Sequence, residues 1–183
     1  MSSWVFFAVA GGIVLYAVWL YNSLVGLRNR VRNAWSQIDV QLKRRHDLIP
    51  NVLESVKAYM THERGVVEQV SLARQNAIAA GSDVAARADA ENALSRSVRS
   101  LFAVAEAYPE LKASANMLSF QEELSSTENR ISFARQHYND AAMEYDTAIE
   151  TVPRNLIAAL FSMRPEALFA TEDADRQPVT VKF

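Results

Sequence analysis

The first 27 residues of the chain carry no charged side chain, and apolar and aromatic residues dominate them. The run from Trp4 to Tyr21 contains only apolar, aromatic and small residues, and residues 22–27 extend it without a charge. A helix of 18 to 24 residues is about 27–36 Å long, which matches the ~30 Å hydrocarbon core of a bilayer. Aromatic residues stand at both ends of the run, as is typical at membrane–water interfaces. The pattern predicts a transmembrane helix over residues 4–27.

A cleaved secretory signal is the alternative explanation of this run. Signal peptides normally begin with basic residues and end at a cleavage site made of small residues. Here no basic residue precedes Trp4, and Leu20-Tyr21-Asn22-Ser23 follows where a cleavage site should lie. The chain contains no cysteine, which also excludes a lipoprotein signal. We therefore favour an uncleaved anchor.

Basic residues dominate the segment that follows the anchor. Residues 28–45 hold one acid, Asp39, and six bases, so this segment carries a charge of +5: Arg28, Arg30, Arg32, Lys43, Arg44 and Arg45. Basic residues close to a span stay on the cytoplasmic side. Residues 1–3 are therefore expected outside and the remainder in the cytoplasm. The segment could also bind anionic lipid headgroups, but we favour an ordinary topogenic flank.

Apolar residues recur every three or four positions after the anchor, which indicates a long helix. This stripe contains only two charged positions, Arg45 and Glu63, and its apolar members are Val31, Trp35, Ile38, Leu42, Ile49, Val52, Val56, Tyr59, Val66, Val70, Ala73 and Ala77. The phase continues through Pro50, so we expect one helix over residues 28–80 with a kink there. Such a helix would be ~80 Å long.

Three further helices are predicted. Gly81-Ser82-Asp83 breaks the pattern and caps a second helix, which Pro109 ends. A third helix begins near Ser114 or Asn116 and carries an apolar heptad in which only Thr127 is polar: Met117, Phe120, Leu124, Thr127, Ile131, Ala134, Tyr138, Ala141, Tyr145, Ala148 and Val152. Pro153 precedes a short fourth helix over residues 156–161. Residues 171–177 read as a polar linker, and residues 178–183 as an extended, strand-like tail.

The predicted fold is all-α: a single N-terminal transmembrane helix followed by a long, antiparallel, coiled-coil-like helical bundle over residues 28–170. The second helix is much shorter than the first, so part of the first helix needs another partner. We expect a homo-oligomer for that reason. From His46 onward the chain holds 13 basic and 20 acidic residues, a charge of −7. This balance argues against a nucleic-acid-binding module.

Several blocks of the sequence resemble one known family in both order and spacing. They include Tyr21-Asn-Ser-Leu-Val-Gly-Leu-Arg-Asn-Arg-Val, the stretch from Ala34 to Asn51, Tyr108-Pro-Glu-Leu-Lys-Ala and Thr151-Val-Pro-Arg-Asn-Leu-Ile-Ala. The chain is thereby identified as a member of the bacterial LemA family. The resemblance implies a single-pass protein of the bacterial inner membrane with its bundle in the cytoplasm. It implies no activity, because the family's biochemical role is not established.

The inventory of reactive groups is small. None of His46, His62 and His137 has a glutamate three residues before it, so the Glu-x-x-His pairs of a di-iron bundle are absent from the sequence. No metalloprotease helix, glycine-rich phosphate loop or nucleophile elbow occurs. A lone histidine between polar neighbours is expected to be solvated. We therefore predict a protein without enzymatic activity, cofactor or metal.

Polar residues around Pro50 are the main candidates for interaction with a partner. The run from Gln41 to Asn51 includes Arg45, His46 and Asp47 and could form an interaction surface near the membrane. The structural alternative, which we favour, places Arg45 inside the core as a layer paired with an acid, because an unpaired buried charge is costly. The other candidate interaction residues are Glu63, Glu128, Arg130 and Asn139. Tyr138 and Tyr145 are expected to be core residues.

Two functions remain open from the sequence. The favoured one is a membrane-anchored helical scaffold that self-associates and organises membrane or partner proteins. The alternative is an adaptor or sensor whose cytoplasmic bundle presents a surface to a protease or signalling partner. The expected partners are the lipid bilayer, further copies of the chain and an unidentified protein, with no nucleic acid.

Overall fold

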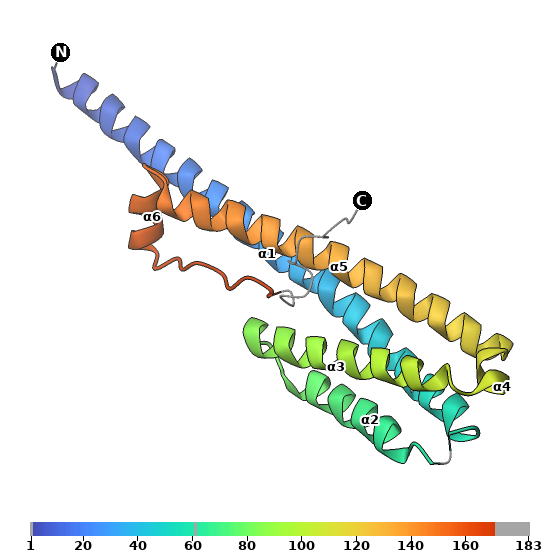
Figure 1. Cartoon of the computed structure of the whole chain (residues 1–183). Coiled ribbons are helices and arrows are strands. Elements are labelled where there is room, and N and C mark those ends of the chain that lie inside the picture. Colours follow the sequence, from blue (N-terminus) through green and yellow to red (C-terminus); the bar gives the residue numbers. More distant parts are fainter. Residues whose placement is uncertain (1, 61, 171–183) are drawn as a thin grey trace, which may run out of the picture. The chain divides into compact units, whose positions relative to one another are not determined.

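The computed structural model describes residues 2–60 and 62–170, and the part of the chain that it describes contains helices and no strands (Figure 1). The helices are α1 (Ser2–Lys57), α2 (Arg64–Ala79), α3 (Val84–Ala105), α4 (Pro109–Lys112), α5 (Ala115–Glu150) and α6 (Arg154–Leu160). The all-helical prediction is confirmed for these residues. The predicted linker and tail, residues 171–183, lie outside them.

α1 is the one described helix that is long and apolar enough to cross a membrane. Its apolar side chains from Trp4 to Trp19 are largely exposed, and Leu20 is the first that is buried. From there burial follows the helical period through Leu24, Leu27 and Val31. α1 therefore changes from a bare apolar helix into a packed one without a break in its backbone.

The prediction of one helix from residue 28 to residue 80 is wrong. α1 continues through Pro50, as expected, but it ends at Lys57, and α2 starts only at Arg64. The backbone N–H of Met60 donates to the carbonyl of Val56 (2.9 Å), and the side chain of Met60 enters the core. After the break, α2 packs against α3 (Figure 1).

Local signals placed the start of α3 correctly and two other helix ends only approximately. The side chain of Asp83 accepts a hydrogen bond from the N–H of Ala86 (2.7 Å), which caps α3, and Gly81 has a φ of 69° that suits glycine. The prediction that Pro109 ends the second helix is wrong, because α3 ends at Ala105 and Pro109 starts the short α4. α6 begins directly after Pro153, two residues before the predicted start.

The chain divides into two compact units, and α1 and α5 each pass through both. The first unit contains residues 1–38 and 134–167. In it, Trp35 packs edge-on against Tyr138 with 5.3 Å between the ring centroids. The predicted α5 stripe is buried here, including Tyr138 and Tyr145, except that Val152 is 79% exposed and was wrongly predicted as core.

Tyr138 ties the chain after α6 back to α5. Its hydroxyl donates a hydrogen bond to the carbonyl of Ala167 (2.8 Å). Burial, with the nearby charges of Glu166 and Asp146, raises the pKa of Tyr138 to about 12. The phenol is therefore neutral at physiological pH and acts as a hydrogen-bond donor.

Among the described residues, the second unit contains residues 39–60, 62–133 and 168–170. Its core joins apolar residues of α1, α2, α3, α4 and α5, among them Ile49, Val56, Val70, Leu94, Leu101, Leu111, Met117 and Leu124. Most of the predicted stripes face this core, whereas Tyr59 is exposed because it lies in the break after α1. Five helices therefore contribute to a core that the sequence had assigned to three.

Candidate functional site

A buried arginine on α1 is the centre of the candidate site. Arg45 lies three residues after Leu42 and four before Ile49, so the helical period places it in the core of the second unit, where it is 2% exposed. An isolated charge at such a position would be costly. The prediction that Arg45 forms a polar layer paired with an acid is confirmed by the contacts below.

Arg45 is held by groups from α3 and α5. Its Nη2 pairs with the carboxylate of Glu91, which is fully buried, and its Nη1 donates to Oε2 of Glu128 (2.8 Å). The same Nη1 donates to Oγ of Ser95 (2.7 Å), and that hydroxyl donates to Oε1 of Glu128 (3.0 Å). Two carboxylates and a hydroxyl thus compensate one buried guanidinium.

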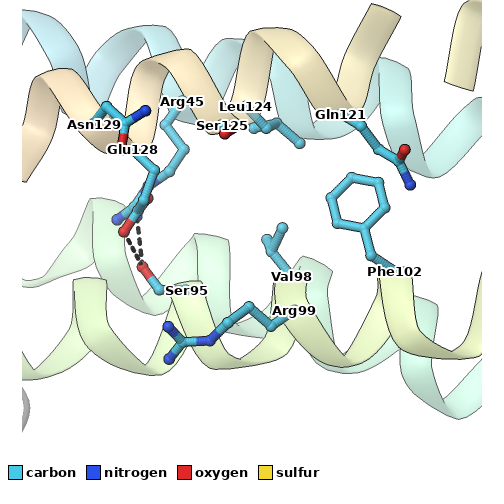
Figure 2. A pocket seen from close by; sticks show the side chains of 10 residues that line it. All are labelled: Arg45, Ser95, Val98, Arg99, Phe102, Gln121, Leu124, Ser125, Glu128 and Asn129. Carbon is cyan, nitrogen blue, oxygen red and sulfur yellow. Dashed lines mark hydrogen bonds and ion pairs between the residues drawn. The ribbon is translucent and has the colours of Figure 1, made fainter. Parts of the chain in front are cut away.

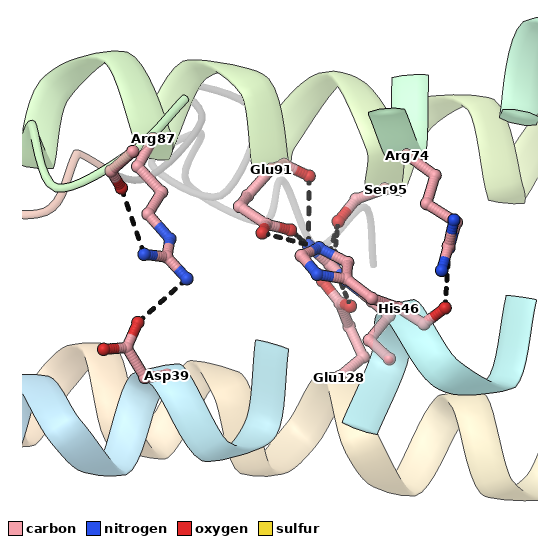
Figure 3. Close-up of polar contacts among 9 residues, drawn as sticks. Asp39, His46, Arg74, Arg87, Glu91, Ser95 and Glu128 are labelled. Atoms are coloured by element: carbon pink, nitrogen blue, oxygen red, sulfur yellow. Dashed lines mark hydrogen bonds and ion pairs between the residues drawn. The ribbon is translucent and has the colours of Figure 1, made fainter. Parts of the chain in front are cut away.

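His46 joins the network from the same helix (Figure 3). Its Nε2 lies 2.9 Å from Oε1 of Glu91, and its backbone carbonyl accepts a hydrogen bond from Nε of Arg74 (2.7 Å). The expectation that this histidine is solvated is wrong, because it is only 7% exposed. His46 lies four residues after Leu42 and three before Ile49, so it shares their buried face of α1.

The electrostatics of the network favour an ionised Glu91. Burial by itself raises the pKa of Glu91, but the contacts with His46 and the charge of Arg45 outweigh it and hold the pKa below its usual range. Glu91 is therefore a permanent negative charge at neutral pH. Glu128, the second acid that pairs with Arg45, is more open to solvent, and 46% of its side chain is exposed.

A second ion pair joins α1 and α3 within the same unit (Figure 3). Nη2 of Arg87 lies 2.8 Å from Oδ1 of Asp39, and Nη1 of Arg87 donates to the carbonyl of Gly81 (3.1 Å). Asp39 is the one acid in the basic segment after the anchor. Its pairing shows that the segment is partly engaged in packing the bundle.

A cavity of about 360 Å³ lies beside the buried network (Figure 2). Arg45, Ser95 and Glu128 form one end of it, and Val98, Phe102 and Leu124 supply apolar surface. Its remaining lining is polar: Arg99, Gln121, Ser125 and Asn129. The cavity thus has a charged end and an apolar wall, a combination that suits an amphipathic group.

The other predicted site residues are scattered. Asp47, Pro50 and Arg130 are exposed, and Glu63 accepts a 3.5 Å hydrogen bond from the hydroxyl of Tyr108. Asn139 is half-buried in the first unit. Of the membrane-proximal bases, Arg28, Arg30, Arg32, Lys43 and Arg44 are exposed, and Arg30 pairs with Glu144 at 3.2 Å. Only Arg45, His46 and Glu128 come together.

Sequence reasoning missed the acid that matters most. Glu91 lies three residues after Ala88 and four before Ser95, so it falls on the buried face of α3. An acid at a core position was the signal that could have paired it with Arg45. Within residues 2–60 and 62–170, no three His, Asp or Glu side chains are grouped so that they could hold a metal ion.

Comparison with known proteins shows which family the chain resembles. A model of the LemA family matches residues 34–183. A protein named LemA from Metamycoplasma hominis is 26% identical over 175 residues, which cover 95% of this chain and 80% of that relative. The family match begins beyond the apolar segment and includes Arg45, Glu91 and Glu128.

Proposed function

This chain belongs to the LemA family, and we propose that it is a membrane-anchored helical scaffold that self-associates and organises membrane or partner proteins, without enzymatic activity. The observation that carries the proposal is that the side chains of α1 change from exposed to buried along the helix. Its side chains are bare and apolar up to Trp19, and from Leu20 onward they are packed against other helices. One element thus supplies both an anchor and a wall of the bundle.

The bilayer is the natural environment for the bare part of α1. Large apolar side chains cover it on all sides, including Phe6, Phe7, Ile13 and Leu15. A helix that is apolar all round is either buried in protein or lies in a membrane. The basic residues that follow support a bundle on the cytoplasmic side of a bacterial inner membrane.

Self-association is supported by apolar side chains that the chain leaves uncovered. In the second unit, five large apolar side chains are more than half exposed: Val40, Leu72, Ile78, Leu118 and Phe133. In the proposal, antiparallel helices of the bundle present these side chains to a second copy. Burial of such side chains contributes ~25 cal/mol per Å² of apolar surface.

The mass of the detergent-extracted particle tests the scaffold. We expect a defined multiple of the mass of the chain, and we expect Phe133→Ser to lower that multiple by weakening the contact. Ser132→Ala is the matched control, since Ser132 is exposed on the same helix and has little apolar surface to lose. A strictly monomeric wild-type particle would rule out self-association.

A second function, an adaptor or sensor, is favoured by the cavity beside Arg45. A cavity with a charged end could take up a group from a protease or signalling partner and couple its binding to the packing of α3 and α5. The same extraction separates the two functions. An adaptor would appear as a single copy of the chain together with one partner protein.

A further inference from the structure

α6 presents an apolar face that no described residue covers. Leu156 and Leu160 on this helix, together with Val152 just before it, are 68%, 74% and 79% exposed. Leu156 and Leu160 are spaced by four residues and therefore lie on one side of α6, whereas Val152 precedes the helix. Phe161, which directly follows α6, is also more than half exposed.

The opposite side of α6 is fixed to α1 inside the first unit (Figure 1). Ala158 is buried, and Nη2 of Arg154 donates a hydrogen bond to Oγ of Ser23 (3.3 Å). The ring of Phe161 packs on Tyr21 with 4.5 Å between the centroids. α6 therefore lies beside residues 21–23 of α1.

This position coincides with the end of the bare apolar part of α1. Trp19 is the last aromatic residue of α1 that is more than half exposed. Tyr21, two residues later, already contacts Phe161. Arg28, less than two turns further along α1, is exposed and charged. The uncovered face of α6 thus lies at the level where the apolar segment gives way to a charged one. That level is where the boundary between acyl chains and headgroups is expected.

We propose that α6, with Val152 and Phe161, is an interfacial helix that lies in the headgroup–acyl boundary of the leaflet crossed by α1. Its occupant is the lipid bilayer. This inference rests on the membrane anchor of the proposed function. In this proposal, the lipid around the end of the bare segment at Trp19 also contacts α6, because Phe161 packs on Tyr21 only two residues further along α1. Amphipathic helices bind membranes by this burial of one apolar face.

A second copy of the chain fits this face less well than lipid does. A standard protein interface buries about 800 Å² per partner. Two exposed leucines on a helix of seven residues, with Val152 before it and Phe161 after it, are too few to form such an interface. Binding to a bilayer requires no shape complementarity, because the headgroup–acyl boundary can bury any apolar face that reaches it.

Spin labels in the full chain test the inference, since the natural sequence has no cysteine. Single-cysteine variants Leu156→Cys, Leu15→Cys and Gln136→Cys are labelled and reconstituted in phosphatidylcholine–phosphatidylglycerol vesicles. Collisions with oxygen report on lipid, and collisions with a water-soluble nickel chelate report on water. Leu15 lies in the bare segment, whereas Gln136 is exposed on α5, about 21 Å along the helix from its end.

The inference expects the ratio of oxygen to nickel collisions at Leu156 to be several-fold higher than at Gln136 and to approach the ratio at Leu15. Leu160→Cys repeats the measurement on the same face and should agree. A water-like ratio at Leu156 with a lipid-like ratio at Leu15 overturns the role of α6 and leaves the anchor intact. Water-like ratios at both positions overturn the anchor itself. Shielding of Leu156 from both reagents, with spin–spin broadening, means that a second copy covers α6 and also overturns the inference.

Discussion

Arg45 and Glu91 are the two residues on which the polar interior of the bundle depends. Both are almost fully buried, and each satisfies the charge of the other. Buried pairs of this kind add little compared with apolar residues, but loss of one partner is strongly destabilising because it leaves a charge without compensation. The role of the pair is therefore structural specificity: it fixes which faces of α1, α3 and α5 meet.

Removal of the charge of Glu91 should destabilise the second unit. We expect Glu91→Gln to lower the free energy of unfolding by about 3 kcal/mol, at the lower end of the range for breaking a buried pair, because Glu128 still contacts Arg45. Glu128→Gln is the matched control and should cost about 1 kcal/mol or less, since Glu128 is half-exposed. Urea denaturation of the detergent-solubilised chain measures both. Equal costs would contradict the central place of Glu91.

The lowered pKa of Glu91 gives a pH dependence of defined sign. The folded state binds the proton of this carboxyl more weakly than the unfolded state does, so stability rises with pH in this range. The contribution is complete above the ordinary value of 4.5 and is lost as pH falls from there through the lower pKa of the folded state. The difference in stability between wild type and Glu91→Gln should therefore shrink as the pH is lowered below about 4.5. A difference that stays constant under acid would contradict the ionised state of Glu91.

The sequence predicted the buried arginine of this network but not the acid that pairs with it. The stripe placed Arg45 in the core and required an acid, which was correct. It did not identify the acid, because a pairing between α1 and α3 depends on how the helices are placed and not on any local pattern. His46 was misjudged because its polar neighbours in sequence suggested a solvated side chain, although it lies four residues after Leu42 and three before Ile49 on the buried face of α1.

At the scale of the elements, the period of apolar residues predicted most of the buried face of α5. The α5 stripe was correct from Met117 to Ala148 and failed at Val152, beyond the end of the helix. Capping residues gave the start of α3 correctly. The break between α1 and α2 was missed because the three-to-four-residue spacing of the stripe continues across it, from Val56 to Val66, with Glu63 as its one charged position there. The packing of α2 against α3, which no local pattern reports, accompanies that break.

A charge in the α5 stripe should unfold the bundle. Ile131 is fully buried, so Ile131→Asp puts a carboxylate without a partner into the core. We expect a loss of about 4 kcal/mol or more, or complete loss of cooperative unfolding. Ser132→Asp, on the exposed side of the same helix, should change stability by about 0.5 kcal/mol at most. Circular dichroism during heating measures both; unchanged melting of Ile131→Asp would mean that this stripe does not face the core.

At the scale of the whole molecule, the sequence supplied the family and the all-helical class. Blocks of residues in the right order and spacing identified the LemA family, and a match over residues 34–183 confirms it. The apolar composition of the first 27 residues predicted the anchor, and the bare surface of α1 up to Trp19 supports it. The cavity beside Arg45 could not be predicted, because it is a property of how α3 and α5 meet.

Site-directed labelling of intact cells tests the anchor and its orientation most directly. Ser126→Cys introduces a single thiol on an exposed position of α5, and Ser3→Cys introduces one at the other end of the apolar segment. With a membrane-impermeant maleimide, our account predicts labelling of Ser3→Cys in intact spheroplasts. It predicts labelling of Ser126→Cys only after the membrane is permeabilised. Labelling of Ser126→Cys in sealed spheroplasts, or recovery of the intact chain in the aqueous fraction, would contradict a bundle that is tethered to the cytoplasmic face.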